Sequence, residues 1–257
     1  MRALTIAATG MSAQEQNLEV IAHNVANINT TGYKADGAVF EEFLSPTASH
    51  GDFLGGDRRL SYVQDRATWI DFSQGPLEQT NNPLDVSVSG NAFLTVTTPR
   101  GERYTRNGAL QINATGQLVT NEGYPVLGDG GPIQFQINDK QIAISADGNI
   151  RVREGADTKS DAQRGRLRLV RFDQVARLQK DGSSLFSAPG GTLPQPVQPP
   201  QRVRVMQGAL EQSNVRGMVE MARMIEITRS YTQIANLLQA HSDMRRGAID
   251  KLSEVPA

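Results

Sequence analysis

Residues 23–34 read HNVANINTTGYK, a stretch that joins a helix-like segment to a β-rich one. Asn24 and Asn27 lie three residues apart, so on a helix they share one face, where their amides could bond to the same face of another copy. The Asn-Thr-Thr triplet that follows favours local side-chain to backbone bonds over further helix. Gly32 can adopt the positive φ that ends a helix. We therefore predict that the helix stops at Gly32 and that the chain takes a new direction immediately after it.

The segment before this stretch has the apolar spacing of a helix. Apolar residues recur three and four positions apart, and only Gln14 interrupts them. This stripe consists of Leu4, Ala7, Met11, Leu18, Ile21, Val25 and Ile28. We assign residues 1–34 to an N-terminal helix with its helix-end motif.

The C-terminal part of the chain carries a second apolar stripe. No proline occurs from residue 201 to residue 255. Apolar residues again recur at spacings of three and four, namely Met221, Met224, Ile227, Tyr231, Ile234 and Leu238. We predict a C-terminal helix over residues 205–257. In most proteins such a stripe packs on a globular core or on another helix.

Between the two helical segments the apolar pattern changes to period two. Residues 83–96, PLDVSVSGNAFLTV, alternate valine with serine, and Asp147-Gly148 separates two further alternating runs as a hairpin turn. We predict a compact, mostly antiparallel β domain over residues 75–188. The predicted fold class is mainly β with terminal α-helices, the β domain being flanked by long N- and C-terminal helices.

Two irregular segments flank this β domain. The run PGGTLPQPVQPP has five prolines in twelve residues, which predicts an extended, semi-rigid strut over residues 189–204. Residues 45–74 carry Gly, Asp and Ser with few periodic apolar positions. We therefore predict an extended loop region over residues 35–74.

Composition excludes several classes of function. The 257 residues include 26 basic and 27 acidic ones, so no global positive field is available to hold a nucleic acid. No run approaches the roughly 20 apolar residues that span a bilayer, and the N-terminal segment turns polar too quickly for a secretory signal. The absence of cysteine excludes disulfides and thiolate metal sites. We expect no nucleic-acid partner, no membrane span and no cleaved signal peptide.

The sequence lacks the common motifs of catalysis and ligand binding. No G-x-G-x-x-G, G-x-x-x-x-G-K-[ST], H-E-x-x-H or G-x-S-x-G pattern occurs. His23, His50 and His241 lie far apart in the chain without the spacing of metal ligands. We expect no enzymatic activity, no cofactor and no bound metal.

Four stretches resemble motifs of the flagellar rod and hook proteins of bacteria, in that family's order. HNVANINTTGYK resembles the N-terminal signature NN-x-AN-x-x-T-x-G-[FY]-K, although His23 replaces the first Asn. PLDVSVSGNAFLTV and YTRNGALQINATGQLVTNEGYPVLG are similar to the family's β-domain motifs. GALEQSNVRGMVEMARMIEITRSY resembles its C-terminal signature, with Thr232 at a position where Glu is frequent.

The resemblance implies a structural subunit of the flagellar basal-body rod. In this family the terminal helices of neighbouring subunits pack together as the inner layer of a helical tube, and the β domain faces outward. A head-to-tail interface of this kind propagates into a filament. The implied partners are copies of the chain itself, neighbouring proximal and distal rod subunits, and the flagellar type III export apparatus. The implied location is the periplasmic rod of the basal body, reached without a cleaved signal peptide.

The same resemblance makes the two apolar stripes an assembly interface. Their contacts with neighbours would offset the cost of ordering the terminal helices. The interface comprises Leu4, Met11, Leu18, Ile21, Asn24, Val25, Asn27, Gly32, Met221, Met224, Ile227, Tyr231, Ile234 and Leu238.

The position within the family rests on residues 60–75, LSYVQDRATWIDFSQG. This stretch lacks the Gly-rich pattern that is typical of the distal rod subunit. The proximal rod subunit is therefore the closer match, and the distal rod subunit is the alternative.

Two functions of other classes remain to be distinguished. A periplasmic hydrolase built on the β domain would need a nucleophile and a base, and turnover in an esterase and glycosidase screen would reveal it. A dimeric coiled-coil module, in which the two terminal helices pair within one protomer, would show its full helix content in circular dichroism of the isolated monomer.

Overall fold

The chain forms two compact units in the computed structural model. The helical unit consists of Met1–Ala26, Asp36–Trp69 and Arg216–Ala257, and the β unit consists of Asn27–Ala35 and Ile70–Val215. The residues that the structure describes are 2–45, 60–154, 161–182, 184–190, 192–197 and 203–253.

The elements of the helical unit are α1 (Arg2–Ala26), β1 (Asp36–Ser45), β2 (Leu60–Ile70) and α2 (Gly217–Ser253). The elements of the β unit are β3 (Leu77–Gln79), β4 (Val86–Ser89), β5 (Phe93–Thr98), β6 (Gly101–Thr105), β7 (Leu110–Ile112), β8 (Leu118–Thr120), β9 (Leu127–Gly128), β10 (Gly131–Pro132), β11 (Asp139–Ile144), β12 (Asn149–Glu154), β13 (Asp161–Arg166), β14 (Leu169–Arg171), the 3-10 helix η1 (Val175–Arg177), β15 (Gln179–Lys180), β16 (Leu185–Ser187), β17 (Gln195–Pro196), β18 (Arg204–Gln207) and β19 (Ala209–Glu211).

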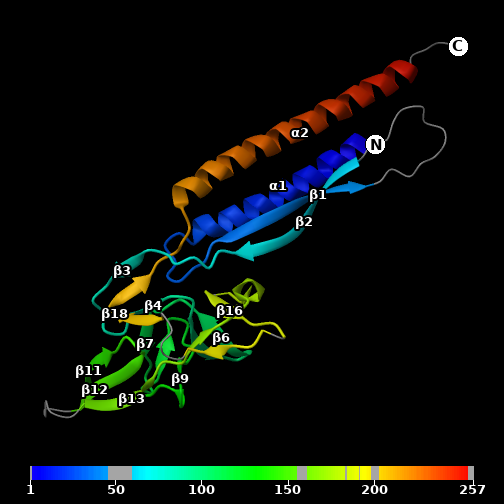
Figure 1. The fold of residues 1–257 in the computed structure, drawn as a ribbon. Helices are drawn as coiled ribbons and strands as arrows, with labels where there is room; N and C mark the ends of the chain where they lie inside the picture. The colour runs from blue at the N-terminus through cyan, green and yellow to red at the C-terminus, as the bar shows by residue number, and fades with distance from the viewer. Residues whose placement is uncertain are drawn as a thin grey trace. The chain divides into compact units, whose positions relative to one another are not determined.

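In the helical unit, α1 and α2 lie side by side, and the two-stranded sheet of β1 and β2 lies next to α1 (Figure 1). The Tyr231 hydroxyl of α2 donates a hydrogen bond to the Glu15 carboxylate of α1 over 3.1 Å. The predicted class, mainly β with a helix near each end of the chain, is confirmed.

α1 ends earlier than the sequence predicted. Its last residue is Ala26, and Asn27 begins a turn in which the Thr30 hydroxyl donates to Asn27 Oδ1 over 3.0 Å. This local side-chain bond competes with helix propagation before Gly32 is reached. Asn27 therefore lies outside the helix, and the prediction that Asn24 and Asn27 share a helix face is wrong.

The C-terminal helix begins at Gly217, so the prediction of helix from residue 205 is also wrong. Residues 204–207 and 209–211 are strands that pair with β4 and β3. Gly208, with φ +75°, separates the two strands. The lack of proline in this segment permits a helix but does not specify one, and pairing with existing strands decides the outcome.

The segment predicted as an extended loop contains strand structure. Residues 36–45 and 60–70 form β1 and β2, which pair with each other. Charged residues interrupt the alternation in both strands, and a Gly- and Asp-rich stretch separates them in the sequence. The period-two signal is therefore weak. Residues 46–59 of the predicted loop lie outside the described residues.

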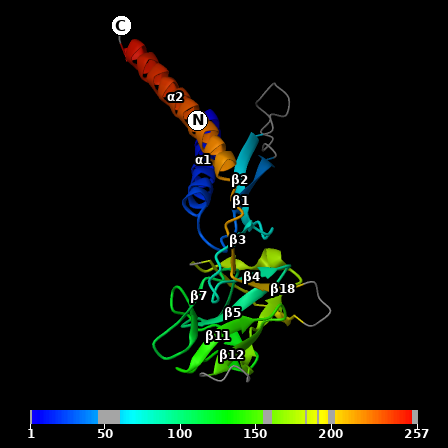
Figure 2. The same cartoon turned by 90° about the vertical axis from the view of Figure 1, so that its left-hand side faces the viewer.

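The centre of the β unit is a six-stranded sheet of order β15-β16-β6-β5-β14-β17, with every neighbouring pair antiparallel. Figure 2 shows β5 of this sheet within the β unit. Smaller sheets join β11-β12-β13, β4-β18, β3-β19, β7-β8 and β9-β10. The Asp147-Gly148 turn lies between the antiparallel β11 and β12, as predicted, with Gly148 at φ +79°.

The core lies on both faces of the six-stranded sheet. Successive residues of a strand point to opposite faces, so Phe93 and Leu94 of β5 enter different clusters. Leu94 packs with aliphatic residues such as Val86 and Ile150, whereas Phe93 packs with aromatic rings such as Phe186. Burial on both faces accounts for the run of buried residues in β5.

The proline-rich segment, predicted as an extended, semi-rigid strut, is partly a strand. Gln195 and Pro196 form β17, the edge strand of the six-stranded sheet, and Val197 packs on the aliphatic core. An edge strand tolerates proline because one side of its backbone needs no partner in the sheet. The described part of the segment is thus extended but belongs to the β domain.

Candidate functional site

The most concentrated polar site lies where three segments of the β unit meet. We call it the junction and define it as residues 27–35, 70–76 and 209–215 together with Arg106. Every crossing of the chain between the two units adjoins one of these segments. Main-chain hydrogen bonds tie them together, because Gly32 N donates to Glu211 O over 2.7 Å and Asp71 N donates to Ala35 O over 2.8 Å.

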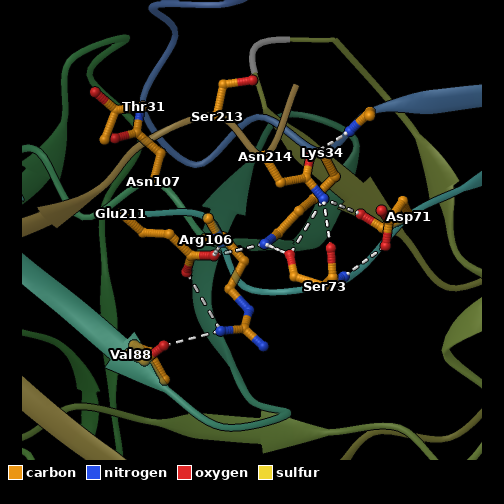
Figure 3. Close-up of polar contacts among 12 residues, drawn as sticks. Thr31, Lys34, Asp71, Ser73, Val88, Arg106, Asn107, Glu211, Ser213 and Asn214 are labelled. Atoms are coloured by element: carbon orange, nitrogen blue, oxygen red, sulfur yellow. Dashed lines mark hydrogen bonds and ion pairs between the residues drawn. The ribbon is translucent and has the colours of Figure 1, made fainter. Parts of the chain in front are cut away.

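A buried ionic cluster occupies the middle of the junction (Figure 3). The Lys34 ammonium donates to Glu211 Oε1 over 2.5 Å and to the Ser73 carbonyl over 2.6 Å. Arg106 Nη1 lies 3.4 Å from Glu211 Oε2. The side chains of Lys34 and Glu211 are 0% exposed and that of Arg106 is 3% exposed. One carboxylate therefore faces two cations away from water.

Burial sets the electrostatics of this cluster. It lowers the pKa of the Lys34 ammonium from its ordinary value, and the Glu211 carboxylate opposes that shift by its charge and hydrogen bond. Burial also lowers the pKa of Arg106, again against Glu211. Both positive charges are thus disfavoured by desolvation, and Glu211 is the group that offsets this cost.

Arg106 links the cluster to the β4–β5 connection. Its guanidinium donates to the Val88 carbonyl over 2.9 Å and to the Gly90 carbonyl over 2.5 Å, and it lies 4.9 Å from the centre of the Phe93 ring. A planar guanidinium suits this role because it carries several donors and can stack on an aromatic face. The cluster is therefore fastened to the main sheet.

Asn214 joins the three junction segments by side-chain hydrogen bonds (Figure 3). Its Oδ1 accepts a hydrogen bond from Ala35 N over 2.7 Å, and its Nδ2 donates to the carbonyls of Asp71 and Ser73 over 2.8 and 3.2 Å. A single amide thus replaces the backbone partners that these irregular segments lack.

Gly32 lets the N-terminal segment approach the end of β6. Its φ is +69°, as predicted from the sequence. A Cβ atom at this position would lie 2.4 Å from Asn107 N and 2.6 Å from the carbonyl carbon of Arg106. The position therefore requires glycine for its backbone conformation and for the contact.

Lys180 covers the same segment. Its ammonium lies 3.9 Å from the centre of the Tyr33 ring and donates to the Lys34 carbonyl over 2.6 Å. A cation over an aromatic face is attracted by the ring quadrupole. Tyr33 and the Lys34 backbone are thereby held against β15.

Asn24, predicted to contact another copy, makes its bonds within the chain. Its Nδ2 donates to Asp36 O and its Oδ1 accepts from Asp36 N, each over 2.8 Å. The side chain is buried, with 1% of its surface exposed. Asn24 thus ties the end of α1 to the start of β1.

The predicted stripe of α1 is only partly buried. Ile21 is buried at 5% exposure, while Met11, Leu18 and Val25 are intermediate, and Leu4 lies in the first turns of the helix. Ala13, which lies outside the predicted stripe, is buried at 8% exposure. The most buried side of α1 is therefore rotated from the predicted one and shares Ile21 with it.

The predicted stripe of α2 is half-buried for most of its length. Met224, Ile227, Tyr231, Ile234 and Leu238 all have intermediate exposure. The Tyr231 bond to Glu15 places this side of α2 toward α1 of the same chain. The stripe thus has a partner within the protomer.

Other apolar residues of α2 are exposed. Met218, Met221 and Ile225 recur at spacings of three and four and are 84, 47 and 55% exposed. We call these three residues the α2 patch. Met221 belongs to it although the sequence placed this residue in the stripe. Further along the helix, Leu237 and Met244 are 65 and 67% exposed.

No sequence pattern pointed to a role for Lys34, Arg106, Glu211 or Asn214. Lys34 lies within the quoted N-terminal motif and Glu211 within the C-terminal one. Their pairing spans 177 positions. No local pattern signals such a contact. Lysine and glutamate are almost never fully buried unless they are paired, so neither residue alone is expected in a core.

Among the described residues, no group of His, Cys, Asp and Glu has the arrangement of a metal site. Within the same residues, neither helix combines the length and the apolarity needed to cross a bilayer.

Three family models match the chain. Residues 4–34 match "Flagella basal body rod protein", residues 87–152 match "Flagellar hook protein FlgE/F/G D1 domain", and residues 206–250 match "Flagellar basal body rod FlgEFG protein C-terminal". The first match ends at Lys34 and the last includes Glu211, so the buried ion pair joins the two terminal regions.

Curated relatives match over nearly the full length. The flagellar basal-body rod protein FlgF of Caulobacter vibrioides is 33% identical over 96% of this chain and 97% of its own. FlgF of Mesorhizobium japonicum is 33% identical over 97% of each chain. The flagellar basal-body rod protein FlgG of Agrobacterium fabrum is 35% identical over 95% of this chain and 97% of its own.

Proposed function

The chain belongs to the flagellar basal-body rod protein family, and from this premise we propose that it polymerises through α1 and α2 within the proximal part of the rod. As a member of this family it is a structural subunit of the bacterial basal body. A rod subunit performs its function by binding its neighbours with defined geometry, so the relevant chemistry is that of contact surfaces.

The observation that carries the proposal is the α2 patch. Neighbouring exposed apolar residues on one helix commonly mark a site of contact with another molecule. Met218 and Ile225 are seven positions apart, which returns them to the same helix face, and Met221 lies between them. A helix that uses one side against α1 and leaves a second apolar side uncovered is suited to contact a neighbouring subunit.

The two predicted stripes contribute to assembly by packing α1 and α2 against each other. Because Ile227, Ile234 and Leu238 are half-buried toward α1, the pair of helices acts as one preassembled surface. Neighbours would then complete the burial of residues such as Met11 and Leu18, which are only partly covered within the protomer. The contacts proposed are with copies of this chain and with the adjoining rod subunits.

The family also supports a route to the rod. We propose that the subunit passes through the flagellar type III export apparatus and is assembled in the periplasm. The proximal position is supported by the names of the FlgF relatives and by the absence of a Gly-rich pattern in residues 60–75. The comparable identity to FlgG relatives makes the distal rod the second candidate.

The test is a variant that changes the α2 patch alone. Met218→Asp with Ile225→Asp places two charges in the proposed contact, where each would have to be desolvated without a partner. The carboxylate introduced by Met218→Asp would lie in the first turn of α2, where the helix dipole favours a negative charge, so the helix itself should remain stable. We expect an unchanged melting temperature of the monomer and, in flagellated cells, export of the subunit without completion of the rod.

The matched control is Gln233→Asp, which adds a charge to an exposed polar position of the same helix. Immunoblots of culture supernatant and of purified basal bodies measure export and incorporation separately. Normal motility of the double variant, at normal subunit levels, would contradict assembly through this patch.

A further inference from the structure

The buried ionic cluster of the junction lies outside the helices to which assembly is assigned. We propose that Lys34, Glu211 and Arg106 form an interlock, in which the N-terminal segment 27–35 stays docked on the β unit only while residues 209–215 hold Glu211 against Lys34. This interlock acts within one protomer and is independent of polymerisation.

The charge balance at the site favours the interlock. Lys34 and Arg106 are two fully or nearly buried cations, and Glu211 is the carboxylate that bonds to both. A buried cation without its partner is strongly unfavourable. If Glu211 were absent, docking residues 27–35 would place the Lys34 ammonium in a water-poor site that already holds the Arg106 guanidinium.

Glu211 closes the junction by its backbone as well as its side chain. Its carbonyl accepts from Gly32 N, and its Oε1 accepts from Gly75 N over 3.0 Å. Asn214, three positions later, binds Ala35 N. Two amides of the segment 27–35, those of Gly32 and Ala35, therefore have their hydrogen-bond partners in residues 209–215.

Arg106 adds a second positive charge to the site. It is held by the carbonyls of Val88 and Gly90 and by the Phe93 ring. Its charge disfavours the nearby Lys34 ammonium, and Glu211, which contacts both cations, offsets this repulsion. Docking of residues 27–35 therefore depends on Glu211.

The experiment compares amide hydrogen exchange in four full-length proteins: the natural chain, Lys34→Met, Glu211→Gln, and the double variant with both changes. Mass spectrometry of peptides covering residues 27–35 reports the junction, including the bonded amides of Gly32 and Ala35. Peptides covering β5 report the main sheet. Asp139→Asn is the matched control, because it removes the Asp139–Arg164 ion pair from a different sheet of the same unit.

We expect Glu211→Gln to accelerate exchange at residues 27–35 by about tenfold or more while β5 exchange stays unchanged. The decisive comparison is the double variant. Because methionine keeps the apolar stem of Lys34 but carries no charge, the double variant should exchange more slowly than Glu211→Gln alone. Asp139→Asn should leave residues 27–35 as protected as in the natural chain.

Two results would overturn the interlock. Unchanged protection of residues 27–35 in Glu211→Gln would show that the carboxylate is dispensable. A double variant that exchanges as fast as Glu211→Gln would show that lost hydrogen bonds, and not the unpaired Lys34 charge, open the junction. If Glu211→Gln fails to fold, recovery of folded protein in the double variant supports the interlock, and continued failure counts against it.

Discussion

Replacing Gly32 by alanine should destabilise the β unit through two separable effects. The first is the backbone conformation, because a φ of +69° costs a residue with a Cβ atom about 1–2 kcal/mol. The second is overlap, because the new Cβ would lie 2.4 Å from Asn107 N and 2.7 Å from Asn107 Cα. Both contacts are with backbone, which cannot rotate away, so forcing them apart should add about 1–3 kcal/mol.

The matched control is Gly123→Ala, because Gly123 also has a positive φ, +85°, but its Cβ would meet nothing within 4 Å. It therefore carries the conformational cost without the overlap. We expect a loss of about 1–2 kcal/mol for Gly123→Ala and about 2–5 kcal/mol for Gly32→Ala in the free energy of unfolding.

Urea denaturation followed by near-ultraviolet circular dichroism measures this difference, because Tyr33 and Tyr104 are buried in the β unit. Equal losses in the two variants would refute the reasoning. They would mean that residues 27–35 detach from β6 at little cost, so that the junction is not part of the stable β unit.

Two further predictions concern the helical unit. Because Ile227 and Ile234 are half-buried, changing both to Asp should lose about 1–2 kcal/mol of apolar burial per side chain. The melting temperature of the monomer's helices, measured by far-ultraviolet circular dichroism, should therefore fall. An unchanged melting temperature would show that the stripe packs only on neighbouring subunits. The hydrogen bond from the Tyr231 hydroxyl to Glu15, and the charge of that carboxylate, raise the pKa of Tyr231 above its ordinary value. Glu15→Gln should therefore lower this pKa in an ultraviolet titration that compares each protein with its Tyr231→Phe counterpart, and no difference would indicate that the helices separate in solution.

Local features of the structure follow from the sequence alone. The alternation around Val86 predicts a strand because a period of two reflects the backbone geometry of a few consecutive residues. The positive φ of Gly32 is predicted in the same way, because glycine has no Cβ atom and readily adopts this conformation at the end of a helix. The periodic stripes likewise place a helix near each end of the chain.

The limits of the helices required more than the local pattern. Residues 204–211 lack proline and could continue a helix, but they pair with β4 and β3 and become strands. Pro196 joins the edge of the six-stranded sheet for a similar reason, because Val170 of β14 lies opposite it. Strand formation depends on a partner that is distant in the sequence, and a local pattern carries no information about that partner.

The buried ionic cluster was decided entirely by tertiary structure. Lys34 and Glu211 are separated by 177 positions, and each taken alone is an ordinary charged residue beside a turn or a strand. Folding places them 2.5 Å apart with Arg106 beside them and excludes water from all three. The sequence determined a helix near each end, a strand-rich middle and the family, whereas this buried pairing arose only when distant segments met, because desolvation and charge balance are properties of the assembled site.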